Sequence, residues 1–274
     1  MGVFCLIALK VVGYWHGSRT EPVGNTVQAN PAPLVSATNA AAATSPAPPG
    51  TLISAEQVLD KLDTWLAKNP NYHALVESAL PSGTVMGRMN VFAYTEATHG
   101  QVVRMKAEVF LPQAIQYQAQ KQNGKLEVYF PRSDQLIEAD TTKMLATMPA
   151  IAANQSGLKG LLKLAHRSFA EASADLRVVT LVLNAEALNL PDTGGDIYLS
   201  LRTSDQGKLL GVEQQAHGQR LITTVKYLSF DRDGVARDAP AMPVGRVAVT
   251  NVTLQAAMKE EALHVMNKRL GKKI

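Results

Sequence analysis

The chain has 274 residues, of which 46% are hydrophobic, and it carries 27 basic and 23 acidic side chains. This length allows a sizeable core, and residues 52–274 fit a single domain. The basic residues are spread along the chain instead of gathering in a patch, which argues against a nucleic-acid partner. The only cysteine, Cys5, precedes the folded region. That region therefore has no disulfide, no thiolate nucleophile and no cysteine zinc site.

Residues 1–16 form an apolar segment that suits a signal sequence or a membrane anchor. Its apolar run, Val3 to Trp15, is shorter than the roughly 20 residues of a membrane-spanning helix. No Lys or Arg precedes this run, and an aromatic pair rather than small residues ends it. A cleaved signal, an anchor and a start that lacks its upstream part all remain open. In each case we expect the protein in the periplasm or cell envelope. The interpretation that we favour is that its N-terminus tethers it to the inner membrane.

Residues 17–51 are rich in Ala, Pro, Ser and Thr, including the runs Ala40–Ala43 and Pro46–Pro49. They show no apolar periodicity, so they cannot bury enough apolar surface to offset the loss of chain entropy on ordering. We expect a disordered linker.

An amphipathic helix begins at Ser54. The sequence Ser54-Ala-Glu-Gln57 matches a capping box, in which the Ser hydroxyl and the Gln side chain satisfy exposed backbone amides. Asn69-Pro70 ends the pattern. The apolar face of this helix comprises Val58, Leu59, Leu62, Trp65 and Leu66.

The next segment alternates between apolar and polar side chains with the period of two typical of a strand. Arg104, Lys106 and Glu108 form the polar side, so one face is buried and the other is solvated, as in an antiparallel sheet. Asn123-Gly124 predicts a type I′ turn into a strand at residues 126–130. The apolar side of the alternation comprises Val103, Met105, Ala107, Val109, Leu111, Ile115, Tyr117 and Ala119.

Residues 141–176 break this alternation, because their apolar side chains recur at helical spacing. We expect a helical insert that contains Leu158, Leu161, Leu162, Ala165 and Phe169. Strands then resume, followed by a C-terminal helix with cations in its last turn. The expected strands are 178–183, 197–201, 209–214, 221–230 and 247–254, with turns at 191–195, 204–207 and 217–218.

The order of elements, with the strand motif Asn123-Gly-Lys-Leu-Glu-Val-Tyr-Phe-Pro131 and the run Thr223 to Phe230, resembles the LolA/LolB-like periplasmic lipoprotein carriers. That superfamily includes RseB-type sensors and mycobacterial lipid-binding lipoproteins, and the resemblance covers about residues 54–235. It implies a mainly β fold with some helix: a curved antiparallel sheet forms an incomplete β-barrel whose concave side is closed by helices. The pair Leu111-Pro112 lacks the basic residue that the shuttling carrier has before its proline, which favours a stationary relative.

The resemblance implies that acyl chains of a lipid or lipoprotein bind between sheet and helices, where an apolar slot also suits them on physical grounds. The alternative is that the same fold is a regulatory or structural module for an envelope protein partner, with Phe92, Tyr94 and Phe110 as an exposed apolar patch. Inward apolar residues are also what any ordinary core requires. The expected lipid-binding residues are Met89, Val91, Val103, Met105, Ala107, Val109, Ile115, Tyr117, Val128, Leu161, Leu162 and Phe169.

The sequence contains no pattern that indicates catalysis. Its six histidines are scattered without metal-ligand spacing. Ser156 and Lys159 match a bare Ser-x-x-Lys pattern, but the partner motifs are absent and a helix cap explains the serine. An envelope hydrolase with an unrecognised site is a third alternative. We expect no catalytic residue, no metal and no cofactor.

Overall fold

The computed structural model describes residues 51–98, 100–110, 115–122, 125–140, 162–163, 165–184, 196–216, 219–250, 257 and 260–265. The N-terminal segment 1–16 and the expected linker up to residue 50 lie outside the described residues. So do the expected turns at Asn123-Gly124, 191–195 and 217–218.

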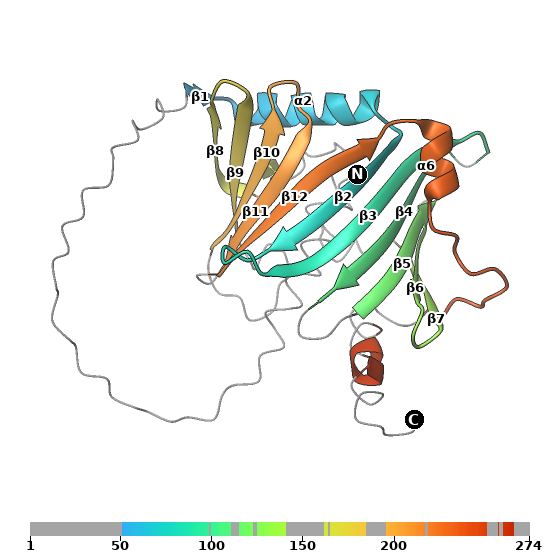
Figure 1. Cartoon of the computed structure of the whole chain (residues 1–274). Coiled ribbons are helices and arrows are strands. Elements are labelled where there is room, and N and C mark those ends of the chain that lie inside the picture. The colour runs from blue at the N-terminus through green and yellow to red at the C-terminus, as the bar shows by residue number, and fades with distance from the viewer. Residues whose placement is uncertain are drawn as a thin grey trace, which may run out of the picture.

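One 12-stranded antiparallel sheet dominates the structure, with strand order β1-β8-β9-β10-β11-β12-β2-β3-β4-β5-β6-β7. Figure 1 shows the sheet twisting strongly, and it does not close into a barrel because β1 and β7 form its two edges. The predicted fold class is confirmed. The strands are β1 (Thr51–Ile53), β2 (Tyr72–Ala79), β3 (Val85–Glu96), β4 (Gly100–Val109), β5 (Ile115–Gln122), β6 (Lys125–Phe130), β7 (Gln135–Asp140), β8 (Ala165–Ala172), β9 (Leu176–Asn184), β10 (Asp196–Ser204), β11 (Leu209–Ala216) and β12 (Gln219–Ser229).

The predicted N-terminal helix is α2 (Ala55–Lys68), which runs along one end of β8–β10 (Figure 1). Ser54 is its N-cap and accepts a hydrogen bond from the Gln57 amide at 3.5 Å, as the capping box predicts. Its buried apolar face packs on inward-facing residues of the sheet. We call this group the helix-covered core: Val58, Leu59, Leu62, Leu66, Ala170, Val179, Leu181, Leu183, Ile197, Leu199, Leu201 and Ala216.

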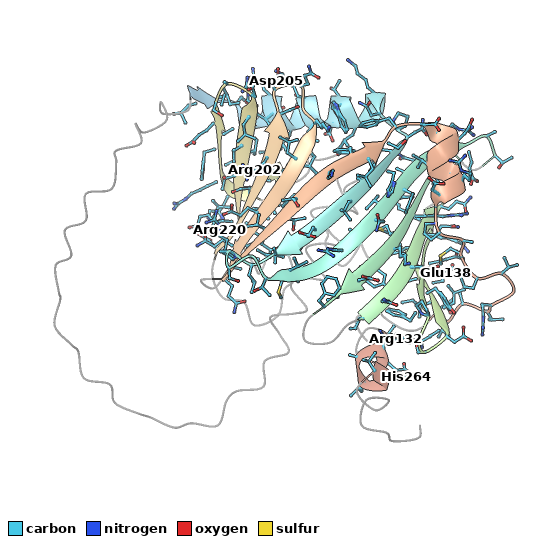
Figure 2. All side chains as sticks on the ribbon, in the orientation of Figure 1. Arg132, Glu138, Arg202, Asp205, Arg220 and His264 are labelled. Carbon is cyan, nitrogen blue, oxygen red and sulfur yellow. The ribbon has the colours of Figure 1, made fainter. Side chains whose placement is uncertain are left out.

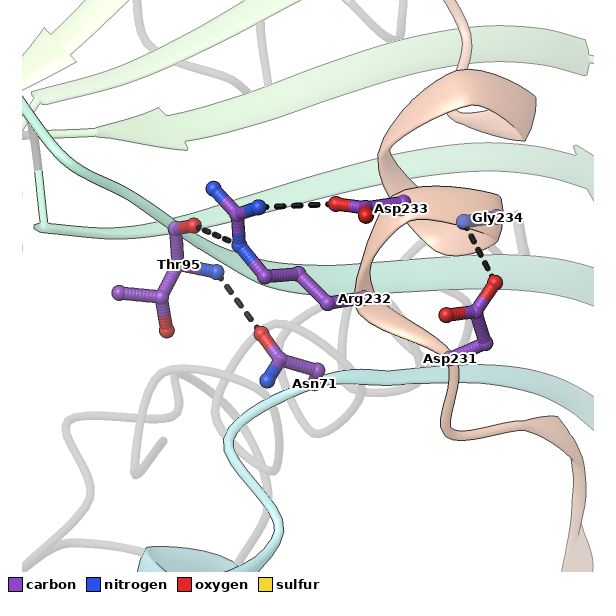
Figure 3. Close-up of polar contacts among 6 residues, drawn as sticks. All are labelled: Asn71, Thr95, Asp231, Arg232, Asp233 and Gly234. Atoms are coloured by element: carbon purple, nitrogen blue, oxygen red, sulfur yellow. Dashed lines mark hydrogen bonds and ion pairs between the residues drawn. The ribbon is translucent and has the colours of Figure 1, made fainter.

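The short helix α6 (Arg232–Asp238) covers the opposite, outer face of the sheet and was not anticipated from the sequence. Asp231 caps it by accepting a hydrogen bond from the Gly234 amide at 2.9 Å (Figure 3). Arg232 fixes it to the end of β3, because its Nε donates to the Thr95 carbonyl at 2.8 Å. Val235 is thereby packed against the sheet.

The burial under α6 corrects one expectation. Phe92 and Tyr94 retain only 6% and 3% of their exposure, because they lie beneath Val235 together with Val102. Phe110 is half-buried. Phe92, Tyr94 and Phe110 therefore do not form the exposed apolar patch that was expected from their position on the mostly polar face of the strands.

Two predicted elements differ from the structure. Residues 165–172 form strand β8 rather than helix, because their backbone pairs with β1 on one side and β9 on the other. In the region expected to hold a strand from 247 to 254, Val249 makes an isolated parallel bridge to Ile137, and residues 251–256 lie outside the described residues. Residues 260–265 are helical, in line with the expected C-terminal helix. Within the described residues, no helix has both the length and the apolar character required to cross a bilayer.

Candidate functional site

The inner face of β2–β7 carries a continuous apolar surface, which we call the inner wall. Strand alternation places these side chains on the same face as the helix-covered core, since Trp65 of α2 contacts Tyr227 and Tyr227 contacts Tyr72, with ring centroids 5.0 and 5.5 Å apart. Ala257, a helical residue near the C-terminus, is buried in the same cluster. The buried members of the inner wall itself are Tyr72, Ala74, Val91, Ala93, Met105, Ala107, Ile115, Tyr117, Ala119, Leu126, Val128, Phe130 and Ile137.

The strand register arranges the inner wall in rows that cross the sheet. One row places Ala74, Val91, Met105, Ala119 and Val128 side by side on β2–β6. Small side chains thus stand among large ones, and Ala93 and Ala107 repeat this in the neighbouring rows.

Nine of the twelve residues predicted to bind lipid lie together in or against the inner wall, which supports the predicted strand register. The polar residues Arg104, Lys106 and Glu108 point to the outer face, as expected from the alternation. The nine residues are Met89, Val91, Val103, Met105, Ala107, Val109, Ile115, Tyr117 and Val128.

Of the three residues expected on a helical lid, the two that the structure describes, Leu162 and Phe169, are not brought to the inner wall. Phe169 is 47% exposed on β8, opposite Thr180 of β9, and this position belongs to the outer face. Its helical spacing with Leu162 was misleading because β8 pairs with β1, which is distant in sequence, as well as with the adjacent β9. Leu162 packs instead against the helix-covered core, and Leu161 lies outside the described residues.

Burial sets the electrostatics of the inner wall. It raises the pKa of Tyr117 to about 12, so this phenol stays neutral. It lowers the pKa of Lys121, whose ammonium is partly removed from water. The outer face differs because polar side chains there satisfy one another: Arg104 donates to Gln120 at 2.8 Å, and Gln116 donates to Glu108 at 2.9 Å.

Sequence reasoning missed inner-wall residues in β2 and β3. Tyr72, Ala74 and Ala93 alternate with polar neighbours, so the period of two could have found them. Lys121 continues the alternation of Ile115, Tyr117 and Ala119, but a charged residue breaks an apolar pattern and was passed over.

The described residues contain no group of three or more His, Cys, Asp or Glu side chains placed to hold a metal ion. Ion pairs among the described residues lie at the surface, such as Arg220 with Glu213 on β12 and β11. Figure 2 shows Arg220 and Arg202 on this part of the sheet, away from α2. These pairs are ordinary solvated contacts that contribute little to stability.

No family model matches the sequence, and no curated protein matches it. Solved structures with a related backbone include LprF from Mycobacterium bovis, at 11% identity and a TM-score of 0.38 over 65% of this chain and 95% of that chain. The Mycobacterium tuberculosis lipoprotein LppX matches at 10% identity and a TM-score of 0.40 over 65% of this chain and 98% of that one. A β-barrel-like protein of unknown function from Brucella abortus matches at 10% identity and a TM-score of 0.20 over 59% and 99%. At these values the likeness is limited to the general fold.

Proposed function

We propose that residues 52–274 form a non-enzymatic carrier or chaperone domain that binds the acyl chains of a lipid or lipoprotein along the inner wall. The observation that carries this proposal is the wall itself: apolar side chains from six neighbouring strands, with alanines set among Val, Met and Tyr. An acyl chain needs an apolar surface with room along it and few fixed polar partners.

The energetics of burial favour such a ligand. Each buried methylene contributes roughly 0.8 kcal/mol, so eight methylenes contribute about 6 kcal/mol before the costs of association. Met89 and Met105 add flexible side chains that can adapt to chains of different shape. A long, narrow ligand therefore suits this face better than a compact polar one.

We further propose that the domain works in the cell envelope, with residues 1–16 tethering it to the inner membrane and residues 17–50 serving as a flexible spacer, since Thr51 already belongs to β1. The support is the apolar N-terminal run and the Ala/Pro-rich composition that follows it. Membrane fractionation of the full chain and of a chain lacking residues 1–16 tests this. The full chain is expected in the membrane fraction, and the shortened chain is expected in the soluble one.

A second candidate function is a regulatory or structural module that binds an envelope protein. One observation favours it: Phe169 and Tyr198 are 47% and 42% exposed on the outer face of β8 and β10. Exposed aromatic side chains are typical of protein interfaces. This function takes precedence if the domain binds no lipid.

Native mass spectrometry of the purified protein, followed by titration with a fluorescent fatty acid, tests the carrier proposal. The substitution Ala107→Trp narrows the inner wall between Met89 and Tyr117, which flank Ala107 on β3 and β5. It is expected to weaken fatty-acid binding about tenfold or more while the melting temperature changes little, because the added ring occupies space that the ligand would fill.

The matched control is Lys106→Trp. It adds the same ring to the residue just before Ala107 on β4, whose side chain lies on the outer face. It should leave binding unchanged. A larger side chain in a core that is already filled lowers the free energy of unfolding by roughly 1 to 3 kcal/mol. Marked destabilisation by Ala107→Trp, with no lipid bound by the unmodified protein, would therefore show that the inner wall is ordinary core.

A further inference from the structure

The inner wall contains one charged residue among the described inward-facing positions of β2–β6, and this residue is Lys121. On β5 it follows Ile115, Tyr117 and Ala119 at intervals of two, so it shares their face. The register places it between Val103 of β4 and Leu126 of β6. Val103 packs against the inner wall and Leu126 is fully buried, so Lys121 has apolar neighbours on both sides.

The acidic side chains of the neighbouring strands cannot neutralise Lys121, because they project from the other face. Glu108 accepts from Gln116 there, Glu96 accepts from Gln122, and Glu127 is the partner of Gln120 in the register. None of the ion pairs or hydrogen bonds found among the described residues involves Lys121. Its ammonium is therefore partly desolvated without a counter-charge from the described strands.

A partly buried ammonium without a counter-charge is unfavourable unless a bound group supplies a negative charge. Burial lowers the pKa of Lys121, which agrees with this loss of hydration. Lys121 also lies one residue from the end of β5. Its methylene stem can lie along the wall while the ammonium reaches the rim, as long cationic side chains commonly do. Lys121 thus places a cation at one end of the apolar inner wall.

We propose that Lys121 binds the anionic head of the lipid whose acyl chain lies along the inner wall. This inference rests on the proposed function and narrows the ligand class to acyl chains with a carboxylate or phosphate head. The strand from Ile115 to Lys121 is about 20 Å long, enough to accommodate the chain of a fatty acid lengthwise. The head group gains a charge-assisted hydrogen bond and supplies the negative charge that the neighbouring strands direct to the outer face.

The test measures displacement of a neutral fluorescent probe, N-phenyl-1-naphthylamine, from the full chain. Three ligands share a sixteen-carbon chain and differ in the head: palmitate, hexadecyl phosphate and hexadecanol. The variants are Lys121→Met, which keeps an apolar stem, Lys121→Arg, which keeps the charge, and Lys106→Met as the outer-face control. Lys106 is exposed on β4, opposite Gln118 of β5.

We expect Lys121→Met to weaken binding of at least one anionic ligand about tenfold, the effect of losing one charge-assisted hydrogen bond, and to leave hexadecanol binding unchanged. Lys121→Arg should retain most of the anion binding, and Lys106→Met should behave like the unmodified protein. A response with palmitate alone identifies a carboxylate head, and a response with hexadecyl phosphate alone identifies a phosphate head. Melting curves should show that Lys121→Met is as stable as the parent, since it removes a partly buried charge.

The inference is overturned if Lys121→Met and Lys106→Met weaken anion binding equally, or if Lys121→Met weakens palmitate, hexadecyl phosphate and hexadecanol alike. If the unmodified protein binds none of the three ligands, the acyl-binding function itself fails. If it binds hexadecanol as tightly as both anions, acyl binding stands and the role of Lys121 fails.

Discussion

Single residues decide how closely the helix and the sheet approach. Gly207, in the turn between β10 and β11, has a φ of +90°, and a Cβ atom there would lie 2.4 Å from the carbonyl oxygen of Lys61 in α2. The same turn is held to the helix by Lys61, whose Nζ donates to the Asp205 carbonyl at 3.3 Å. Figure 2 shows Asp205 beside α2. A side chain at position 207 would thus push the hairpin away from the helix.

Gly207→Ala is expected to destabilise the protein by roughly 3 kcal/mol, because it combines a left-handed backbone with a backbone clash. Gly83→Ala is the matched control: Gly83 has a φ of +85°, but no atom lies within 4 Å of an added Cβ. It should cost only about 1 kcal/mol, the strain of the backbone alone. Chemical denaturation of both variants measures the difference. Equal losses would mean that the turn does not pack tightly on α2.

Among the secondary-structure elements, helix α2 stabilises strands β8–β10, which are not part of the inner wall. Its residues Val58, Leu59, Leu62 and Leu66 provide the apolar cover for β8–β10. The helix also links the two apolar groups, because Trp65 near its C-terminal end contacts Tyr227. Loss of packing under α2 should therefore weaken the sheet and not just the helix.

Leu62→Ala should lower the free energy of unfolding by about 2 to 5 kcal/mol, since Leu62 is fully buried and its removal leaves a cavity. Thr64→Ala, on the exposed side of the same helix, is expected to be neutral or slightly stabilising because Ala has the higher helix propensity. Equilibrium unfolding in urea checks both. A loss below about 1 kcal/mol for Leu62→Ala would indicate that α2 is only loosely docked.

For the whole molecule, the strand order ties together segments that are far apart in the chain. β12 pairs with β2, and β1 pairs with β8 through Thr51, Leu52 and Ile53. Residues 51–53 thus add a short edge strand to the sheet, and Ile53 packs against the helix-covered core. The described part of the sheet therefore includes residues 51–53.

Deletion of residues 1–50 should leave the stability of the domain unchanged, whereas deletion of residues 1–53 should lower it by roughly 2 kcal/mol. The longer deletion removes the partners of Ala170–Ala172 on β8 and the packing of Ile53. Thermal unfolding of the two shortened chains makes the comparison, and limited proteolysis of the full chain should yield a stable fragment that starts close to residue 51. Protection of residues 40–49 from protease would contradict the expectation of a disordered linker.

The sequence by itself determined the features that depend on local periodicity. Alternation with a period of two is a property of each strand alone, so Val103, Met105 and Tyr117 could be assigned to one face before any pairing was known. The N-cap at Ser54 follows from hydrogen bonds within a single turn of helix. These features need no information from distant parts of the chain.

Only the tertiary structure decided the features that depend on partners far away in sequence. Residues 165–172 form a strand between the adjacent β9 and the distant β1, and this backbone pairing outweighs the helical spacing of their apolar side chains. Phe92 and Tyr94 became buried because α6 covers them. The sequence already showed that Lys121 continues the inward side of its strand. That the carboxylates of the described neighbouring strands face outward depends on the register, because cross-strand contacts are set by long-range pairing.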